Sequence, residues 1–311
     1  MNLKSVFLLG LLFTLLVGCE ENKSVGQNIH TRGTVLPLNI PGDRSAQLNS
    51  MEDPRLSEKL NALIRQQPGW SELVNAGKMS VGLVDLSDTQ NMRFAQVNGD
   101  VMMYAASLPK IAILLASMDA MESGELPDNA EIRADLYRMI SFSDNQASTR
   151  MIDRLGYNKI ESVLTDPRYQ LYDQSHGGGL WVGKRYAAGG ARHPEPMQGL
   201  SHAATATQVC RFYYMLATGN LVSRERSAQM LEIMVNPSLH HKFVHSLDQL
   251  APNAQVYRKS GSWQAWHCDS ALVWDNSWRR YILVALVEDP SGEQIIREIV
   301  PIAERCINPA Q

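Results

Sequence analysis

The stretch Ala105–Lys110 reads AASLPK, and the interpretation of the whole chain turns on it. It follows a strand-like segment and begins a long apolar run, so it joins an extended element to a helix. Ser107 and Lys110 are three positions apart and share one face of a helical turn. The lysine amine can activate the serine hydroxyl as a nucleophile if burial or nearby cations lower its pKa. Alternatively, Ser107 is a helix cap and Lys110 a surface residue.

Two further strings carry polar groups suited to the same site. Ser143 and Asn145 in SFSDN offer a hydroxyl that can pass on a proton and an amide that can hold a substrate, or they form a capping turn. The string KSG, Lys259–Gly261, lies in a strand candidate. Its lysine can bind a carboxylate and its glycine lets a ligand approach the backbone; the alternative is a solvent-facing edge strand. The three strings in this order exceed what composition produces by chance.

The order of the predicted elements indicates a segregated α+β fold. A helical period follows AASLPK for more than about a hundred residues, and a last helix spans Glu293–Cys306. The strand candidates are residues 79–87, 92–97, 256–263, 270–275 and 279–288. Strands at both ends with helices between them predict one sheet built from both termini.

The N-terminus has the pattern of a secretory signal, with Lys4, an apolar stretch and then Gly18-Cys19. It is too short and wrongly flanked for a spanning helix. Its end, LVGC, resembles the bacterial lipobox, so we expect a lipid on Cys19 after cleavage; the alternative is an ordinary signal with an incidental cysteine. Because Glu20 and not aspartate follows, we expect an outer-membrane anchor facing the periplasm. The predicted organisation is a signal over 1–19, a polar tether over 20–50 and one domain over 51–311.

Composition and charge narrow the classes of function. The chain has 311 residues, of which 44% are hydrophobic and 20% charged, as in a globular protein. A net charge of -3 gives no basic footprint for nucleic acid. Cys210, Cys268 and Cys306 allow at most one internal disulfide, whose partners the sequence leaves open. No cysteine spacing resembles a zinc knuckle, and the run HHKFVH (240–245) is expected to be a polar helix face, so no metal is predicted.

The motifs S-x-x-K, SDN and K-S-G in this order resemble those of class A β-lactamases and penicillin-binding proteins. The resemblance covers about residues 53–306. It implies a β-lactamase/transpeptidase-like fold: an antiparallel five-stranded sheet with helices on its faces and a helical subdomain between its two halves. It also implies that Ser107 is the acylated nucleophile, Lys110 its base or proton relay, and Ser143 the proton shuttle to the leaving nitrogen.

The resemblance also implies which residues bind the substrate. Asn145 would orient Lys110 and the substrate amide, while the substrate carboxylate would be held by Lys259 and Ser260, with Gly261 beside it. The backbone N–H groups of Ser107 and Ser262 would form an oxyanion hole. No organic cofactor is implied.

One motif of class A enzymes is missing. Their E-x-x-L-N glutamate activates the water that releases the acyl group, and the interval 174–205 does not contain it. Glu195, the one acid between Asp173 and Glu225, is the candidate base; alternatively it is a solvated loop carboxylate. Without such a base, acylation can proceed while release is slow, as in a penicillin-binding protein.

The sequence therefore predicts a lipid-anchored periplasmic serine hydrolase that acts on β-lactams through a Ser107 acyl-enzyme. One alternative is a D,D-peptidase, transpeptidase or esterase of the same fold, acting on peptidoglycan-derived substrates. Another is a non-catalytic penicillin-binding or sensing lipoprotein. Trp263, which follows KSG, is expected either to line the cleft or to pack beneath a loop.

Overall fold

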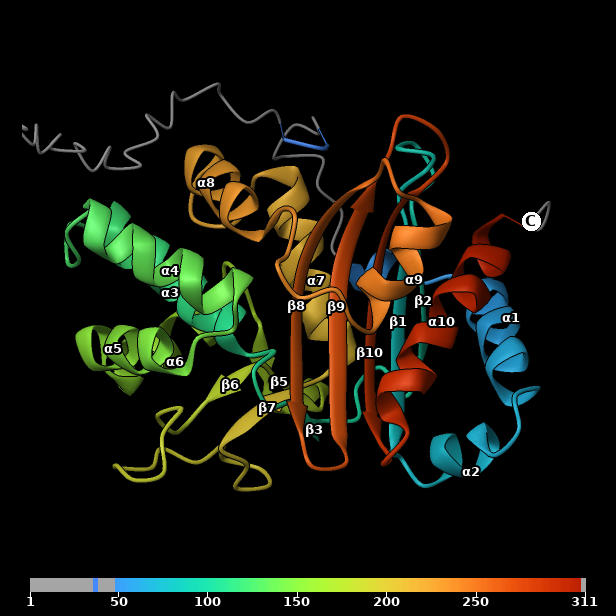
Figure 1. Ribbon diagram of the computed structural model, residues 1–311, viewed down its shortest axis with the longest axis horizontal. Helices are drawn as coiled ribbons and strands as arrows, with labels where there is room; N and C mark the ends of the chain where they lie inside the picture. Colours follow the sequence, from blue (N-terminus) through green and yellow to red (C-terminus); the bar gives the residue numbers. More distant parts are fainter. Residues whose placement is uncertain (1–35, 39–47, 309–311) are drawn as a thin grey trace, which may run out of the picture. The chain divides into compact units, whose positions relative to one another are not determined.

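A five-stranded antiparallel sheet forms the centre of the computed structural model, which describes residues 36–38 and 48–308 (Figure 1). Its strand order is β2-β1-β10-β9-β8. The strands are β1 (Met79–Asp85), β2 (Arg93–Val97), β8 (Gln255–Trp263), β9 (Trp266–Trp274) and β10 (Arg280–Glu288). Because β1 pairs with β10, the sheet joins the two ends of the domain, which confirms the predicted α+β class.

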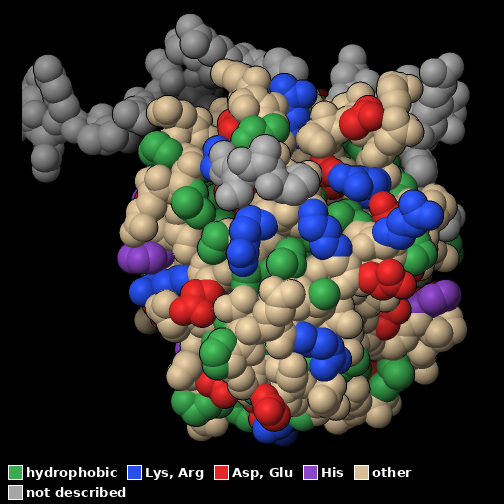
Figure 2. All heavy atoms as spheres, turned by 90° about the vertical axis from the view of Figure 1, so that its right-hand side faces the viewer, with side chains coloured by type: hydrophobic (Ala, Val, Ile, Leu, Met, Phe, Trp, Pro, Cys, Tyr) green, Lys and Arg blue, Asp and Glu red, His purple; other side chains and the backbone are tan. Residues whose placement is uncertain are grey.

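Helices cover both faces of the sheet, and the strands are apolar on both sides accordingly. Along β10, Ile282 and Val284 enter one core, while Leu283 and Ala285 enter the other. The second core lies under four helices: α1 (Pro54–Arg65), α2 (Trp70–Asn75), α9 (Phe243–Leu250) and α10 (Gly292–Ile307). Figure 2 shows the outside of this layer, where basic and acidic side chains are interspersed.

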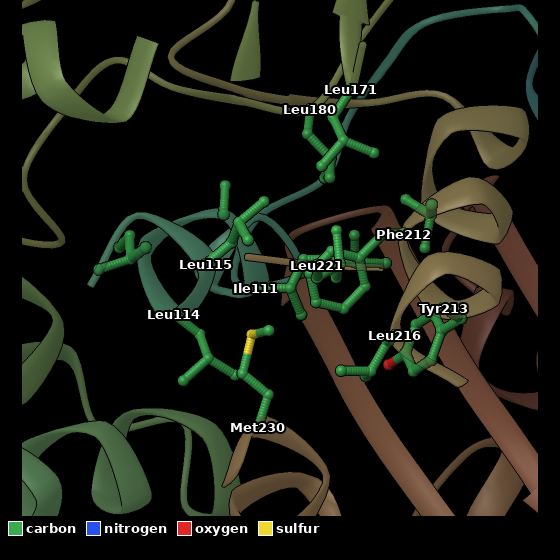
Figure 3. Close-up of a cluster of buried hydrophobic side chains, with 14 of the residues drawn as sticks. Ile111, Leu114, Leu115, Leu171, Leu180, Phe212, Tyr213, Leu216, Leu221 and Met230 are labelled. Atoms are coloured by element: carbon green, nitrogen blue, oxygen red, sulfur yellow. The ribbon is translucent and has the colours of Figure 1, made fainter. Parts of the chain in front are cut away.

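The other face carries α7 (Ala206–Thr218) and, beyond it, the predicted helical subdomain (Figure 1). Its helix α3 (Lys110–Glu122) is buried along almost its whole length, which explains why its sequence is apolar on every side. Figure 3 shows Ile111 and Leu115 of α3 packed with Phe212 of α7 in one cluster. The remaining helices are α4 (Ala130–Ser141), α5 (Asn145–Leu155), α6 (Tyr157–Leu164), α8 (Arg224–Met234) and the 3-10 turns η2 (Leu48–Met51) and η3 (Gln174–His176).

The expectation of a continuous helical period after AASLPK is wrong between residues 172 and 204. This interval forms the short strands β4 to β7: β4 pairs with β5, and β7 pairs with β6 and with β3, which lies before the serine turn. Their bounds are β3 (Met103–Tyr104), β4 (Tyr172–Asp173), β5 (Gly178–Gly179), β6 (Trp181–Val182) and β7 (His202–Ala204). Strands of two or three residues are too short to produce a readable alternation of apolar and polar positions.

Most of the predicted signal and tether, including Cys19, lies outside the described residues. The described part of the predicted tether packs on the domain, since Leu36, Leu38 and Leu48 are buried in the core beside α7. Leu38 also donates its N–H to the carbonyl of Ala217 at 3.1 Å. In the described ranges, no helix has the length and apolar content that crossing a membrane requires. Cys210, Cys268 and Cys306 are free, buried thiols.

The contact between β1 and α7 predicts a stability effect at Gly82. An added Cβ there would lie 2.6 Å from the Cys210 sulfur and 3.3 Å from the Ala206 carbonyl oxygen. We expect Gly82→Ala to lower the free energy of unfolding by about 1–3 kcal/mol, measured by urea denaturation. The loss should shrink in a Cys210→Ala background, and Gly189→Ala, where an added Cβ has open space, should change little. A full loss in both backgrounds would show that the sulfur is not the obstacle.

Candidate active site

Ser107 lies in the turn that leads from β3 into α3. The helix begins at Lys110, so Ser107 stands just before it and not within its first turn as predicted. Hydrogen bonds from Leu108 N to Ala105 O at 3.0 Å and from Lys110 N to Ser107 O at 3.3 Å close this turn, and Ala106 has a φ of 47°. Among the described residues the Ser107 hydroxyl has no hydrogen-bond partner, and it lines a cleft. The hydroxyl is therefore available to a ligand.

Lys110 is fully buried and does not lie on the surface, so the surface alternative is wrong. Its Nζ donates to the Ser143 carbonyl and the Asn145 Oδ1, both at 2.8 Å, and lies 3.3 Å from the Ser143 hydroxyl. Burial lowers the pKa of Lys110 to about 7, although the Asp144 carboxylate acts in the opposite direction. A substantial fraction of this amine is neutral near neutral pH, as a base must be.

The SDN string forms the capping turn that the sequence analysis gave as its alternative. Asp144 caps α5 by accepting from the N–H groups of Gln146 and Ala147 at 2.8 and 3.0 Å. The cap fixes the turn, in which Ser143 has a φ of 57°. Ser143 Oγ thereby lies 3.3 Å from Lys110 Nζ and 3.0 Å from Lys259 Nζ. A hydroxyl between two amines can relay a proton.

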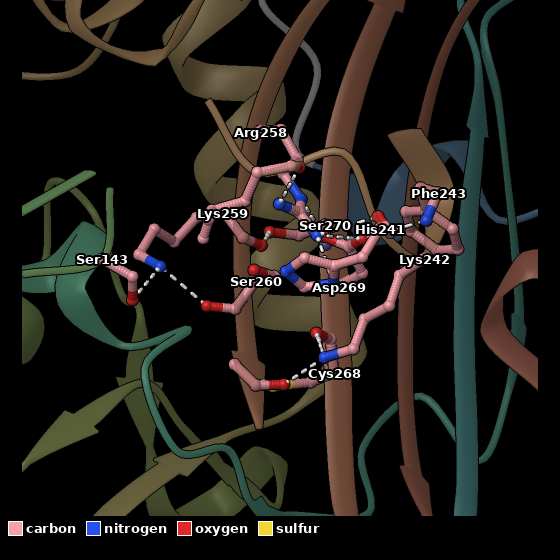
Figure 4. A network of polar contacts seen from close by, with 12 residues as sticks. Ser143, His241, Lys242, Phe243, Arg258, Lys259, Ser260, Cys268, Asp269 and Ser270 are labelled. Atoms are coloured by element: carbon pink, nitrogen blue, oxygen red, sulfur yellow. Dashed lines mark hydrogen bonds and ion pairs between the residues drawn. The ribbon is translucent and has the colours of Figure 1, made fainter. Parts of the chain in front are cut away.

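The KSG string lies on β8, at the edge of the sheet, and the Lys259 side chain extends from that strand toward Ser143 (Figure 4). Lys259 is 1% exposed, so it is not part of a solvated edge. Burial and the charge of Lys110 hold the pKa of Lys259 well below its usual value. An added Cβ on Gly261 would lie 2.7 Å from Ser107 N and 2.4 Å from Ala105 O. Only glycine permits this approach of β8 to the serine turn.

The cleft in front of Ser107 has a volume of about 890 Å³ and no carboxylate in its lining. Asn145 and Ser262, the residue directly after KSG, contribute to its wall, whereas Lys259, Ser260 and Gly261 themselves do not line it. Trp263 also lines it and is 58% exposed, which confirms the cleft position that the sequence left open. Tyr104 and Trp266 add two more aromatic rings, which pack edge to face with centroids 5.5 Å apart.

Tyr186 is a site residue that the sequence analysis missed. It lies in the interval where the E-x-x-L-N motif is absent, and its ring centroid is 4.4 Å from Lys110 Nζ. Its hydroxyl donates to the Ala106 carbonyl at 3.2 Å, so it also holds the serine turn. His202 lies against the same ring, and burial lowers the pKa of His202 to about 4. Only the position of Tyr186 in this interval could have pointed to it from the sequence, because a lone tyrosine forms no recognisable motif.

Glu195 is placed away from the other site residues. It is 1% exposed, so the solvated-loop alternative is wrong. Its carboxylate accepts from the Tyr172 hydroxyl and from the N–H groups of Met197 and Gln198 at 2.7 and 2.6 Å. It does not line the cleft that holds Ser107. These contacts are those of a carboxylate that organises its own loop.

A second group of buried charges lies behind β8 (Figure 4). Arg258 and Asp269 form an ion pair through two contacts of 2.7 and 2.8 Å, and both side chains are almost fully buried. Arg258 also donates to the carbonyls of Leu239 and His241, so the pair ties the loop before α9 to the sheet. The predicted polar helix face over 240–245 is wrong, because residues 240–242 precede α9 and the next two residues, Phe243 and Val244, are buried. Among the described residues, no group of three metal-ligating side chains is present.

The chain is similar to proteins of known type over most of its length. The model of the family described as "Beta-lactamase enzyme family" matches residues 55–135 and 127–308. A β-lactamase from Sphaerobacter thermophilus is 17% identical with a TM-score of 0.63, over 81% of this chain and 97% of that one. A β-lactamase from Chitinophaga pinensis is 16% identical with a TM-score of 0.62, over 83% and 100%.

A third similar structure is a variant of PBP-A, described as an acyl-enzyme complex with penicillin G. It is 18% identical with a TM-score of 0.62, over 83% of this chain and 98% of that one. At these identities the structures establish the β-lactamase/transpeptidase fold. No relative among curated proteins matches the chain.

The environment of Lys110 predicts a titration that can be observed directly. We expect its Nζ to titrate near pH 7 in NMR of protein labelled at lysine Cε. Asp144→Asn should move the titration to lower pH, because it removes the carboxylate that favours the charged amine, while an amide oxygen can still cap α5. Asp166→Asn, which removes a carboxylate paired with Arg168, is the control. A Lys110 titration near pH 10 in the unmodified chain would contradict its role as a neutral base.

Proposed function

Because this chain belongs to the β-lactamase enzyme family, we propose that it is a serine hydrolase that β-lactams acylate at Ser107. The observation that carries the proposal is the neighbourhood of Ser107. Its hydroxyl has no hydrogen-bond partner among the described residues, Lys110 is a buried amine with a pKa of about 7, and Ser143 lies between two lysines. A nucleophile, a base and a proton relay are the parts that acyl transfer requires. The lipid anchor on Cys19 and the periplasmic location belong to the proposal on sequence grounds alone.

The proposed acylation passes protons among Ser107, Lys110 and Ser143 to the leaving nitrogen. The neutral Lys110 amine takes the proton of Ser107 Oγ as that oxygen bonds to the lactam carbonyl carbon, which becomes tetrahedral. The C–N bond then breaks, and the leaving nitrogen receives the proton of the Ser143 hydroxyl. Ser143 is reprotonated by Lys110, whose Nζ is 3.3 Å away. The amine ends neutral, as it began.

Fixed groups of this chain would stabilise the negative charge of the substrate carboxylate and of the tetrahedral intermediate. The backbone N–H groups of Ser107 and Ser262 would stabilise the oxyanion of the tetrahedral intermediate. Lys259 and Ser260 would bind the substrate carboxylate from β8, and Asn145 would hold the substrate amide beside Lys110. The absence of acidic side chains from the cleft lining favours an anionic substrate as well.

Release of the acyl group is the step for which the cleft is least equipped. No carboxylate lines the cleft, and the Tyr186 ring covers Lys110. We therefore propose a long-lived acyl-enzyme, as in a penicillin-binding protein. This favours a second candidate function, transfer or hydrolysis of a peptidoglycan-derived acyl group, over rapid β-lactam hydrolysis. Glu195 is proposed as a structural carboxylate and not as the deacylating base.

Intact-protein mass spectrometry with benzylpenicillin tests the proposal. We expect one adduct of the mass of the drug to form on the native chain and to persist for hours. Ser107→Ala should show no adduct while keeping its circular dichroism and melting temperature, because the half-buried hydroxyl makes no hydrogen bond within the described residues. Continued labelling of this variant would exclude Ser107 as the nucleophile. An adduct that disappears within seconds as hydrolysed drug accumulates would contradict slow release.

Tyr186 provides a gain-of-function prediction. We expect Tyr186→Glu to place a carboxylate near Lys110 and to accelerate loss of the acyl group by about tenfold or more, because a general base can then activate water. Tyr186→Gln has a similar shape without the charge and is the matched control. Both rates are followed by mass spectrometry after removal of free drug, so that an effect on acylation stays separate. Equal acceleration in both variants would mean that the ring acts by excluding water.

A further inference from the structure

Lys242 is a third buried lysine, and neither the sequence motifs nor the proposed acylation uses it. It immediately precedes α9, is fully buried, and does not line the cleft. Its backbone has φ 56° and ψ -124°, a region that costs free energy for a residue with a side chain. Its Nζ donates to the Gly261 carbonyl, to the Ser262 hydroxyl at 2.7 Å and to the Cys268 carbonyl at 3.1 Å (Figure 4). All three acceptors lie on β8 and β9, at the KSG segment.

The register of β8 and β9 shows which way the Gly261–Ser262 peptide faces. The strands are joined by the two-residue turn Gln264-Ala265, with Trp263 opposite Trp266. In a two-residue hairpin that closing pair is hydrogen-bonded, and bonded and non-bonded pairs alternate along the ladder. Gly261 is then in a bonded pair with Cys268, so its carbonyl points toward β9. The Ser262 N–H, on the same trans peptide, points toward the free edge of the sheet.

The free edge at this point adjoins the nucleophile. An added Cβ on Gly261 would lie 2.7 Å from Ser107 N, so the β8 backbone and the serine turn are in contact. Ser107 and Ser262 both line the cleft. The peptide unit between Gly261 and Ser262 therefore has a buried ammonium group at its carbonyl end and the acyl-binding cleft at its N–H end.

We propose that Lys242 is a positioning residue that holds and polarises the Gly261–Ser262 peptide, so that its N–H binds the transition-state oxyanion more strongly. This rests on the proposed function, because it assumes acylation at Ser107. A charged donor on a carbonyl draws electron density toward its oxygen and makes the N–H of the same amide a stronger donor. The arrangement acts where charge develops and is in place before the substrate binds. Lys242 itself does not touch the substrate, because it lies on the side of the peptide away from the cleft lining.

The fixed position of Lys242 follows from its surroundings. The next residue, Phe243, donates its N–H to Asp269 Oδ2 at 3.1 Å. The same carboxylate holds Arg258, whose guanidinium donates to the His241 carbonyl at 3.2 Å. The residues on either side of Lys242 are thus tied to the sheet, which keeps the lysine over Gly261 despite its costly backbone angles.

Lys242→Met tests the inference through the two constants of acylation. We expect the maximal rate of acylation by a chromogenic cephalosporin to fall by about tenfold or more, because a weakened oxyanion donor acts on the transition state. The apparent dissociation constant of the non-covalent complex should change less than about twofold. Affinity for a boronic acid, which forms a tetrahedral adduct with the serine, should fall in parallel with the rate. Lys59→Met is the matched control, since Lys59 Nζ donates to the backbone carbonyl of Cys306 at 2.7 Å, away from β8.

Lys242→Gln is the second variant, in case the methionine variant does not fold. It keeps an N–H donor without the charge, and we expect a smaller loss in the same two quantities. An unchanged acylation rate and boronate affinity in a folded variant would overturn the inference and leave the proposed function intact. A raised dissociation constant with an unchanged rate would overturn it too, by making Lys242 a substrate-binding group. Failure of the native chain to be acylated would overturn the proposed function and the inference together.

Discussion

The burial of positive charge beside the serine turn is the constraint on which the site depends. Lys110, Lys242, Arg258 and Lys259 are each at most 2% exposed, and Asp269 is the buried carboxylate that faces this group. Removing a cation from water without an anionic partner is costly, so the lysines rely on carbonyl and hydroxyl oxygens. Those oxygens stabilise the charged amine less than a carboxylate would. The result is a group of lysines whose pKa values are lowered, and for Lys110 the value of about 7 is what the proposed base requires.

The fold supplies the rigidity that makes this burial possible. Helix α3 is apolar on all sides and sits in the core, so Lys110, at its first residue, starts from a fixed backbone. Strand β8 pairs with β9 along its length and has one bridge, between Val235 and Tyr257, on its other edge; further along, at Gly261, its backbone contacts the serine turn. The two elements come from distant parts of the chain and meet through Ser143, whose hydroxyl lies within 3.3 Å of both Lys110 and Lys259. The free energy gained by tight packing of the two cores thus offsets the cost of burying these cations.

The sequence was sufficient for the parts of this arrangement that follow local patterns. Two strands near the start and three near the end predicted the central sheet, and three short strings predicted residues that lie close together, since the Ser143 hydroxyl is within 3.3 Å of both Lys110 and Lys259. Tyr186 and Lys242 escaped prediction, because each acts through a contact with a residue far away in the sequence, and neither residue type marks a motif. The short strands between residues 172 and 204 escaped for a related reason: tertiary contacts and not periodicity form them.

Within the described residues no carboxylate is hydrogen-bonded to Lys110, and this has a physical consequence that links the two halves of the proposed reaction. A carboxylate beside the amine would favour its charged form and raise its pKa, as Asp144 already does from a greater remove. The same carboxylate is what the activation of a deacylating water calls for. A site that relies on a neutral lysine for attack would therefore have less neutral amine if it gained a carboxylate to activate water. In this chain the Tyr186 ring occupies the space over Lys110, and a ring offers far less charge than a carboxylate. In the proposed mechanism this neighbour favours the amine as base and makes release of the acyl group the slower step.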